Sequence, residues 1–303
     1  MSTSYKIGVD GGGTKTECIL VDARGEIVAR HLAPGCNPSV VGPEQARLVV
    51  TDALCALLAD ARARNHGAEI SATHFYAAGA SGFWQEFAGS LADFGRVSAH
   101  TDALPVLELA TDGAPGLVLH AGTGSFVAAR APDGSIHYAG GIGWRFGDAG
   151  SGYELGRRAI ARGLLELQGW QPPTRFGTLV RDHTQLGPEA DAAAVTRFFY
   201  AHAEPNRVVA ALAPAVLRLA EEGDLTALAL VVDSAAELLA LATHVATKLF
   251  PATPLDAVRA GLSGAILVHP LILDALAART PLPLTPITAP PIEGVRRLLA
   301  RAT

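Results

Sequence analysis

The chain has 303 residues, which is enough for two domains or one large one with a substantial core. Hydrophobic residues make up 49% and charged residues 17%, a balance typical of a compact globular enzyme that excludes a disordered chain. The formal net charge of -5 gives no attraction to nucleic acid or to anionic lipid. We therefore expect no nucleic-acid partner and no role at a membrane surface.

The three cysteines, Cys18, Cys36 and Cys55, are few and widely spaced. No C-x-x-C pair is present, so the sequence supports no zinc site, iron–sulfur cluster or disulfide framework. Residues 1–6 are polar and lack the apolar segment of a signal peptide. No uninterrupted apolar run approaches the roughly 20 residues of a membrane helix. These features predict a cytoplasmic protein that does not contact a membrane.

The first half of the chain alternates short β-rich segments with glycine turns. Strands are predicted at residues 5–10, 15–22, 26–32, 73–78 and 96–101. Asp22 and Gly25 predict a hairpin turn, because they supply a side-chain hydrogen bond and a positive φ. A helix is predicted at 43–64, where Leu48, Leu54 and Leu58 recur at helical spacing, and a second helix at 83–94.

The same order of elements begins again further along the chain. Strands are predicted at 117–120, 126–130 and 136–139, with a hairpin turn at 132–135. The glycine turns that begin at Gly11 and Gly122 occupy matching places in these two β-turn-β-hairpin-β units. We infer an internal duplication with two related lobes and a cleft between them; a chance resemblance of two β-meanders is the alternative.

The second half is mainly helical. Alanine and leucine recur at helical spacing from 151 to 250, most clearly at 225–250. A strand at 257–262 then leads into a helix that ends near residue 278. A proline-rich stretch at 281–291 predicts a linker or an edge strand, and a last short helix is predicted at 292–300.

The first candidate site is the glycine turn between the first two strands. Gly11, Gly12 and Gly13 let backbone N–H groups approach a phosphate without obstruction by Cβ atoms, and Thr14 adds a hydroxyl donor. Asp10, at the end of the strand, could hold Mg²⁺ through water, as phosphoryl transfer requires. The spacing matches neither a Walker A loop nor a dinucleotide-binding fingerprint. The alternative is a tight hairpin that uses glycine for its geometry alone.

The second candidate is the turn formed by Gly122, Thr123, Gly124 and Ser125. It has the same mixture of free N–H groups and hydroxyls. Together, the two turns could clamp a triphosphate from two sides.

Two aspartates are further candidates for a functional site. Asp102 follows the strand at 96–101 and could accept a hydroxyl proton as a general base, or could cap the next helix. Asp148, in the glycine-rich loop at 140–152, could accept hydrogen bonds from sugar hydroxyls or could cap a helix. The small residues at 261–265 could admit an adenine or a ribose, or could serve ordinary helix–strand packing.

These motifs, in this order, resemble the N-acetylglucosamine kinase and BadF-type ATPase family, within the superfamily of sugar kinases, actin and heat-shock chaperones. The resemblance covers nearly the whole chain and includes Asn37 and the segment Thr101-Asp102-Ala103. It implies an α/β fold, the two-lobed actin-like ATPase (ribonuclease H-like) fold with a central nucleotide cleft. The N-terminal lobe would comprise residues 1–112 and 289–303, and the C-terminal lobe residues 113–288.

The resemblance also implies roles for individual residues. Asp102 would be the catalytic base, and Asp10 would hold Mg²⁺ through water. The ATP-binding residues would be Gly11, Gly12, Gly13, Thr14, Lys15, Gly122, Thr123, Gly124, Ser125, Gly261, Ser263 and Gly264. The sugar-binding residues would be Asn37, Ser81, Gly82, Asp102, Gly140, Gly141 and Asp148.

The implied activity is ATP-dependent phosphorylation of an amino sugar, with N-acetylglucosamine converted to its 6-phosphate, ATP and Mg²⁺ as cofactors and a homodimer as the assembly. Ile142 and Ala149 stand where family kinases acting on this sugar commonly carry Trp and Glu, so glucosamine or another sugar stays open. A regulatory ATPase of the BadF type is the alternative from another class. The spacing of the cysteines lacks the pair that would hold the iron–sulfur cluster of such activators.

Overall fold

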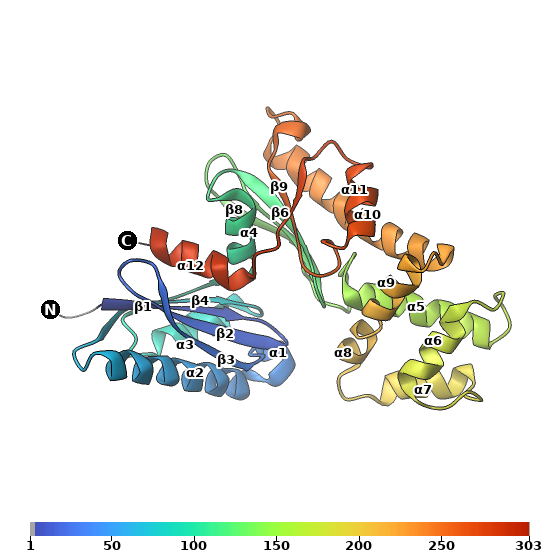
Figure 1. Ribbon diagram of the computed structural model, residues 1–303, viewed down its shortest axis with the longest axis horizontal. Helices are drawn as coiled ribbons and strands as arrows, with labels where there is room; N and C mark the ends of the chain where they lie inside the picture. The colour runs from blue at the N-terminus through green and yellow to red at the C-terminus, as the bar shows by residue number, and fades with distance from the viewer. Residues whose placement is uncertain (1–3, 303) are drawn as a thin grey trace. The chain divides into compact units, whose positions relative to one another are not determined.

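The computed structural model describes residues 4–302, so residues 1–3 and 303 of the predicted N-terminal lobe lie outside the described part of the chain. The chain divides into two compact units. Unit 1 comprises the residues up to Gly113 together with those from Ala289 onward, and unit 2 comprises Ala114–Thr288. Each unit is built on one five-stranded sheet with helices packed against it (Figure 1).

The sheet of unit 1 has the strand order β3-β2-β1-β4-β5. Its strands are β1 (Ser4–Gly11), β2 (Lys15–Val21), β3 (Ile27–Pro34), β4 (Glu69–Ala77) and β5 (Arg96–Thr101). The first three strands pair antiparallel, whereas β4 and β5 run parallel to β1. In the register of the parallel strands Gly11 pairs with Ala77 and Ala77 with Thr101. The carboxyl ends of β1, β4 and β5 therefore meet at one edge of the sheet.

Helices cover both faces of this sheet. They are α1 (Pro38–Val41), α2 (Pro43–Arg64), α3 (Ser81–Gly89), α4 (Ala103–Thr111) and α12 (Pro291–Arg301). Ile7 and Val9 of β1 join a core with α2 and α3, while the alternate residue Gly8 faces Val295 and Leu299 of α12. Figure 1 shows α2 and α12 on opposite sides of the strands. The C-terminal helix thus completes the unit that the N-terminal strand begins.

The sheet of unit 2 repeats this topology, with the order β10-β9-β6-β7-β8. Its strands are β6 (Gly116–Ala121), β7 (Ser125–Arg130), β8 (Ile136–Gly140), β9 (Ala260–Ser263) and β10 (Leu284–Pro286). Again the first three pair antiparallel, and β9 and β10 continue parallel to β6 and to each other. The two sheets share strand order and strand directions, so the duplication inferred from the two glycine turns is present in the fold.

Unit 2 is otherwise helical, as its alanine and leucine periodicity predicts. Its helices are α5 (Gly152–Leu167), α6 (Arg175–Thr184), α7 (Ala192–Ala201), α8 (Pro205–Ala210), α9 (Ala213–Glu221), α10 (Leu225–Leu249) and α11 (Pro270–Ala277), with a 3₁₀ turn η1 (Leu255–Ala257). Buried residues of α9, α10 and α11 form the main core together with β6 and β7. A smaller cluster joins α6, α7 and α8.

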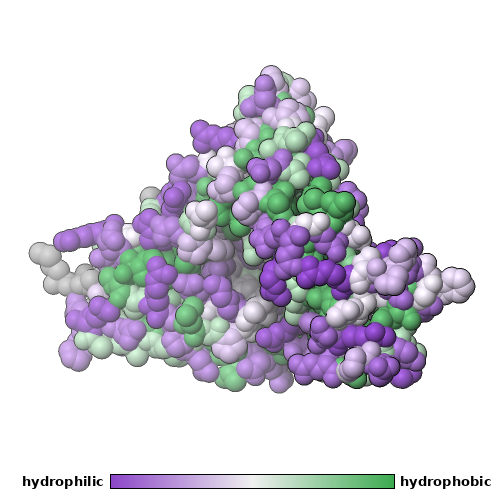
Figure 2. Space-filling model, turned by 45° about the vertical axis from the view of Figure 1, so that its right-hand side comes forward, coloured by the Kyte–Doolittle hydropathy of each residue, from purple (hydrophilic) through white to green (hydrophobic). Residues whose placement is uncertain are grey.

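Helix α10 is long and apolar enough to cross a membrane by length and composition, and it is the one such helix within residues 4–302. Its residues Val231, Ala235 and Leu238, however, are buried in the core of unit 2. Asp233 also interrupts its apolar sequence, which agrees with the expectation of no uninterrupted run. Helix α10 therefore contributes one face to the core of unit 2. On the face drawn in Figure 2, hydrophilic residues predominate and hydrophobic residues are exposed in smaller patches.

Several element boundaries differ from those predicted. Strand β4 begins at Glu69 rather than at residue 73, because pairing with β1 extends it. Helix α3 ends at Gly89 rather than at residue 94, and β9 begins at Ala260 after a 3₁₀ turn. Helix α1 is not among the predicted elements, because it is too short to show a helical periodicity in the sequence. Leu48 of α2 is exposed, because it lies about 240° around the helix from Leu54.

Candidate active site

The turn that we call hairpin 1, residues 11–14, joins β1 to β2 at the carboxyl edge of the unit 1 sheet. A Cβ atom on Gly11 would lie 2.7 Å from Cys36 Sγ, so packing alone requires glycine there. Gly12 N–H closes the turn by donating to the carbonyl of Lys15 at 2.9 Å. The space beside Gly13 is open within 4 Å, so packing does not explain that glycine. Backbone geometry therefore accounts for part of the glycine run and leaves one side of it accessible to a ligand.

Asp10 lies at the base of hairpin 1, half-buried at the end of β1. Burial raises the pKa of its carboxyl to about 7; Lys15 lowers the pKa, whereas Asp102 and Glu17 raise it further. In this environment a nearby cation would strongly stabilise the ionised form of the carboxyl group. Within residues 4–302 no group of three or more His, Cys, Asp or Glu side chains is placed to hold a metal ion. A cation at Asp10 would therefore take most of its ligands from water or from a substrate.

Asp102 stands at the first residue beyond β5, where α4 begins. Its side chain makes no capping hydrogen bond; instead Ala103 N–H donates to Thr101 Oγ1 at 3.3 Å. Thr101 Oγ1 in turn donates to the Asp102 carboxylate at 3.2 Å. Burial raises the pKa of Asp102, and the hydrogen bond from Thr101 opposes this shift. The capping alternative is wrong for this side chain, and the carboxylate is better suited to accept a proton than an ordinary surface aspartate.

Asn37 lies beside hairpin 1, at the carboxyl end of β3. The neighbouring Cys36 N–H donates to the carbonyl of Gly12 at 3.0 Å, and Asn37 Oδ1 caps α1 by accepting from Ser39 N–H at 3.0 Å. A Cβ atom on Gly79 would lie 2.9 Å from Asn37 Oδ1, so the loop after β4 packs against Asn37. Ser81 and Gly82 follow this loop and are exposed at the start of α3. Unit 1 thus brings most of its predicted site residues to one edge of its sheet.

Hairpin 2, residues 122–125, joins β6 to β7 at the corresponding edge of unit 2. Its carbonyls accept hydrogen bonds from the start of α5: Gly122 O from Gly152 N–H at 2.8 Å, and Thr123 O from Tyr153 N–H at 3.2 Å. Ser151 caps the same helix, because its hydroxyl accepts from Glu154 N–H at 3.1 Å. The first turn of α5 is therefore satisfied within the protein, and hairpin 2 is held rigidly against it.

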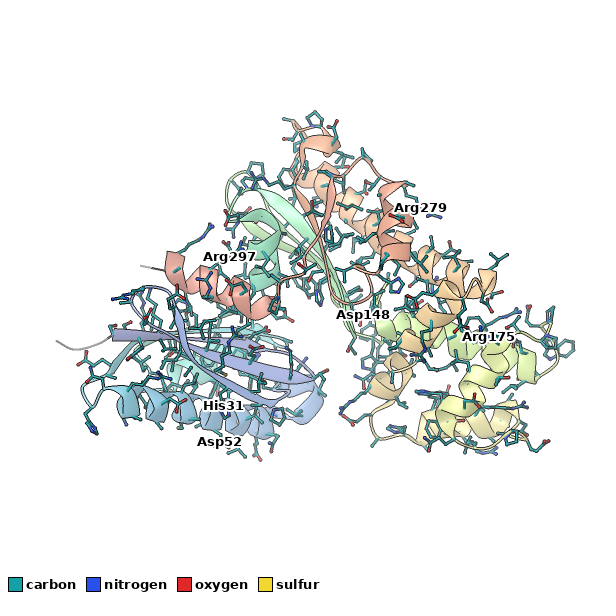
Figure 3. The ribbon with its side chains drawn as sticks, viewed as in Figure 1. His31, Asp52, Asp148, Arg175, Arg279 and Arg297 are labelled. Atoms are coloured by element: carbon teal, nitrogen blue, oxygen red, sulfur yellow. The ribbon has the colours of Figure 1, made fainter. Side chains whose placement is uncertain are left out.

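Asp148, labelled in Figure 3, lies in the loop that leads into α5. Because Ser151 is the helix cap, the alternative that Asp148 caps α5 is wrong. Its carboxyl oxygen Oδ2 would lie 3.2 Å from a Cβ atom on Gly124, so the carboxyl group rests against hairpin 2. Burial raises its pKa to about 6, and the backbone N–H of Ser125 opposes this shift. Gly140 and Gly141, at the start of the loop, both adopt positive φ.

The segment at 261–264 reaches the same edge through β9. His120 Nδ1 lies 3.2 Å from Ser263 Oγ, which ties this segment to the strand before hairpin 2. Burial lowers the pKa of His120 to about 4, so the imidazole is neutral at physiological pH. Gly264 has a φ of 89° and packs against the backbone of Ala121. Close packing against the backbone of β6 therefore explains Gly264, while Gly261 and Ser263 are buried in β9, where they pair with β6.

One charged residue at this edge of unit 1 belongs to none of the motifs described above. Glu17 is only 8% exposed and pairs directly with Asp10 in the register of β1 and β2. A glutamate in the otherwise apolar segment after Lys15 is the signal that could have identified it.

Two sheets of identical topology, each carrying a glycine hairpin at its carboxyl edge, define the actin-like ATPase class of α/β folds. The model of the BadF/BadG/BcrA/BcrD ATPase family matches residues 7–255. The chain belongs to this family, and the family implies that it uses ATP.

Individual relatives agree with this assignment. The chain is 28% identical to an N-acetyl-D-glucosamine kinase of Dictyostelium discoideum over 262 residues, which is 82% of this chain and 81% of that protein. A crystal structure of a candidate N-acetylglucosamine kinase from Chromobacterium violaceum superimposes with a TM-score of 0.76 at 29% identity, covering 97% of this chain and 98% of the other. A ROK family glucokinase from Streptomyces griseus shares the fold, with a TM-score of 0.55 at 16% identity over 99% of this chain and 100% of that one.

Proposed function

We propose that the chain is a sugar kinase that transfers the γ-phosphoryl group of ATP to an amino sugar, with N-acetylglucosamine converted to N-acetylglucosamine 6-phosphate. The observation that carries the proposal is the environment of Asp102: its pKa is raised, and its carboxylate does not serve as a helix cap. The names of the Dictyostelium and Chromobacterium relatives support the choice of sugar.

In this mechanism Asp102 accepts the proton of the sugar O6 hydroxyl as that oxygen attacks the γ-phosphorus of ATP. The new O–P bond forms while the bond from phosphorus to the β–γ bridging oxygen breaks, and ADP leaves. The phosphate oxygens would accept hydrogen bonds from backbone N–H groups and hydroxyls of Gly11, Gly12, Gly13 and Thr14 and of Gly122, Thr123, Gly124 and Ser125. The exceptions are Gly12 N–H, Gly122 N–H and the Ser125 hydroxyl, which already donate within the protein. Such fixed donors stabilise developing charge without reorganising during the reaction. Lys15 would add a positive charge to the first set, and Gly261, Ser263 and Gly264 would contact the nucleoside.

Mg²⁺ belongs to the proposal as the ion that accompanies the triphosphate. The carboxyl of Asp10 fits it, because a pKa raised to about 7 beside other carboxylates indicates a site that a cation would stabilise. Mg²⁺ commonly keeps several waters and binds through one or two carboxylates plus substrate phosphates. When bound, the ion would neutralise charge on the transferring phosphoryl group.

The sugar would contact Asn37, Ser81, Gly82, Asp102, Gly140, Gly141 and Asp148. The side chains of Ile142, which is exposed, and of Ala149 are apolar. Neither can therefore donate a hydrogen bond to a polar substituent of the sugar or accept one from it. Discrimination between N-acetylglucosamine and glucosamine would then depend on the remaining residues of the loop. The proposal also places the protein in the cytoplasm and takes it as a homodimer. Light scattering on the purified protein would test the homodimer.

A panel of sugars tests the proposal. Purified protein with ATP and Mg²⁺ is assayed for ADP release alone and with N-acetylglucosamine, glucosamine or glucose. We expect stimulation by an amino sugar, with N-acetylglucosamine the best substrate. Stimulation by glucosamine alone would identify glucosamine as the substrate and would still support a sugar kinase. Release of ADP that no sugar stimulates would contradict the kinase and favour a regulatory ATPase that acts on a partner.

A further inference from the structure

Glu17 occupies the centre of a charged cluster on β2. Its side chain is 10% exposed, and its Oε1 accepts a hydrogen bond from Arg30 Nη1 at 2.9 Å. Its other oxygen, Oε2, lies 3.5 Å from Lys15 Nζ. The Glu17 side chain therefore joins two cations that come from two different strands.

The register of the strands explains this arrangement. Asp10 lies directly opposite Glu17 across the β1–β2 pair, so the two side chains share one face of the sheet. Lys15 precedes Glu17 by two residues on β2 and faces the same way. Arg30, on β3, pairs with Ile19 of β2, so Arg30 is the diagonal neighbour of Glu17. Backbone pairing thus fixes Glu17 between Asp10 and the two cations, directly behind hairpin 1.

An acidic side chain at this place requires a physical reason. Asp10 and Asp102 already bring two carboxyl groups to the edge of the sheet, and a third buried carboxylate would repel a triphosphate. Arg30 removes this difficulty, because its guanidinium cancels the charge of Glu17 at hydrogen-bonding distance. What remains is the second oxygen of Glu17, which faces the ammonium group of Lys15.

Lys15 is the residue that gains from this contact. Its side chain is 61% exposed, and it follows hairpin 1 immediately, so without an anchor it would sample many rotamers in solvent. A lysine restrained beside hairpin 1 loses less entropy when it contacts a phosphate.

We propose that Glu17 is a positioning residue for nucleotide binding: it holds Lys15 beside hairpin 1, while Arg30 neutralises its own charge. The inference rests on the proposed function only in taking hairpin 1 as a phosphate site. It predicts that Glu17 acts on nucleotide affinity through Lys15, and that it affects neither the sugar nor the transfer step.

A double-mutant cycle of Glu17→Gln and Lys15→Ala tests the proposal. The measurement is calorimetric binding of a non-hydrolysable ATP analogue with Mg²⁺, without sugar. We expect Glu17→Gln to weaken binding about threefold to tenfold in the wild-type background and less than twofold in the Lys15→Ala background, consistent with one partly exposed charge contact. In steady-state assays KM for ATP should rise by a similar factor, while kcat and KM for the sugar stay within about twofold.

Glu86→Gln is the matched control, because it removes an exposed ion pair of unit 1, from Arg47 to Glu86 at 2.8 Å, that lies outside the hairpin. It should leave analogue binding unchanged. If Glu17→Gln does not fold, Glu17→Asp shortens the reach to Lys15 and keeps the charge, and it should weaken binding in the same Lys15-dependent way. Equal losses in both backgrounds would overturn the positioning role. Absence of analogue binding to the wild-type protein would instead contradict the proposed function.

Discussion

At the scale of single residues, the proposed mechanism depends on two carboxyl groups whose surroundings shift their proton affinity. Asp10 lies at the end of β1 and Asp102 follows β5, two parallel strands that are separated by β4. Both pKa values are raised first of all by burial. Neither environment could be read from the sequence, because burial arises from segments far apart in the chain. The positions of both aspartates at strand ends, by contrast, could be predicted from the apolar runs before them.

Replacing Asp102 by Asn keeps the shape of the side chain and removes its ability to accept a proton. We expect sugar-dependent ADP release to fall by about 10²–10⁴-fold, the range for loss of a general base, with ATP binding nearly unchanged. The control is Asp52→Asn, on an exposed aspartate of α2 that Figure 3 labels. Full activity of the Asp102→Asn variant would exclude a proton-accepting role.

Asp10 gives a prediction for stability as a function of pH. Its pKa is raised from 3.8 to about 7 in the folded protein, so between these values the folded state binds more protons at this group than the unfolded state does. Its contribution to stability is therefore complete below about pH 4 and is lost as the pH rises through 7. In Asp10→Asn this loss is absent, so the variant should gain thermal stability relative to wild type as the pH rises from about 4 to 7. Melting curves at several pH values provide the measurement; a constant difference would show that the pKa is ordinary.

At the scale of elements, the sequence predicted turns well and predicted the ends of strands and helices poorly where pairing or packing decides them. The turns at 22–25 and 132–135 appear where the sequence predicts them, and Gly25 and Gly134 both adopt positive φ. Strand β4 and helix α3 differ from prediction because partners in space, rather than local propensity, set their limits. The hydrogen bonds from α5 to hairpin 2 were equally hidden, since they join backbone groups about thirty residues apart.

The packing of α12 on α4 can be tested by one substitution. A Cβ atom on Gly294 would lie 2.6 Å from the carbonyl carbon of Pro105, and backbone cannot move aside as a flexible side chain can. Gly294→Ala should therefore lower the free energy of unfolding by about 1–3 kcal/mol, as other overpacked contacts do. Gly89→Ala, at the end of α3 with open space around it, is the control and should be neutral or slightly stabilising. Equal stability of the two variants in urea titrations would contradict close packing of these helices.

At the scale of the whole molecule, the duplicated topology is the feature that the sequence revealed most clearly. Two glycine turns, each placed between an incoming strand and a hairpin, were sufficient to indicate two related sheets. The family match and the likeness to solved structures agree with that fold. The fold alone does not assign residues to phosphate, metal or sugar, because a ligand is selected by the chemistry of individual side chains.

Identification of the products tests the proposed kinase activity most directly. Purified protein is incubated with ATP, Mg²⁺ and N-acetylglucosamine, and the mixture is analysed by mass spectrometry and phosphorus NMR. We expect one equivalent of sugar 6-phosphate for each ADP formed. ADP accompanied by inorganic phosphate and unmodified sugar would contradict the proposed activity.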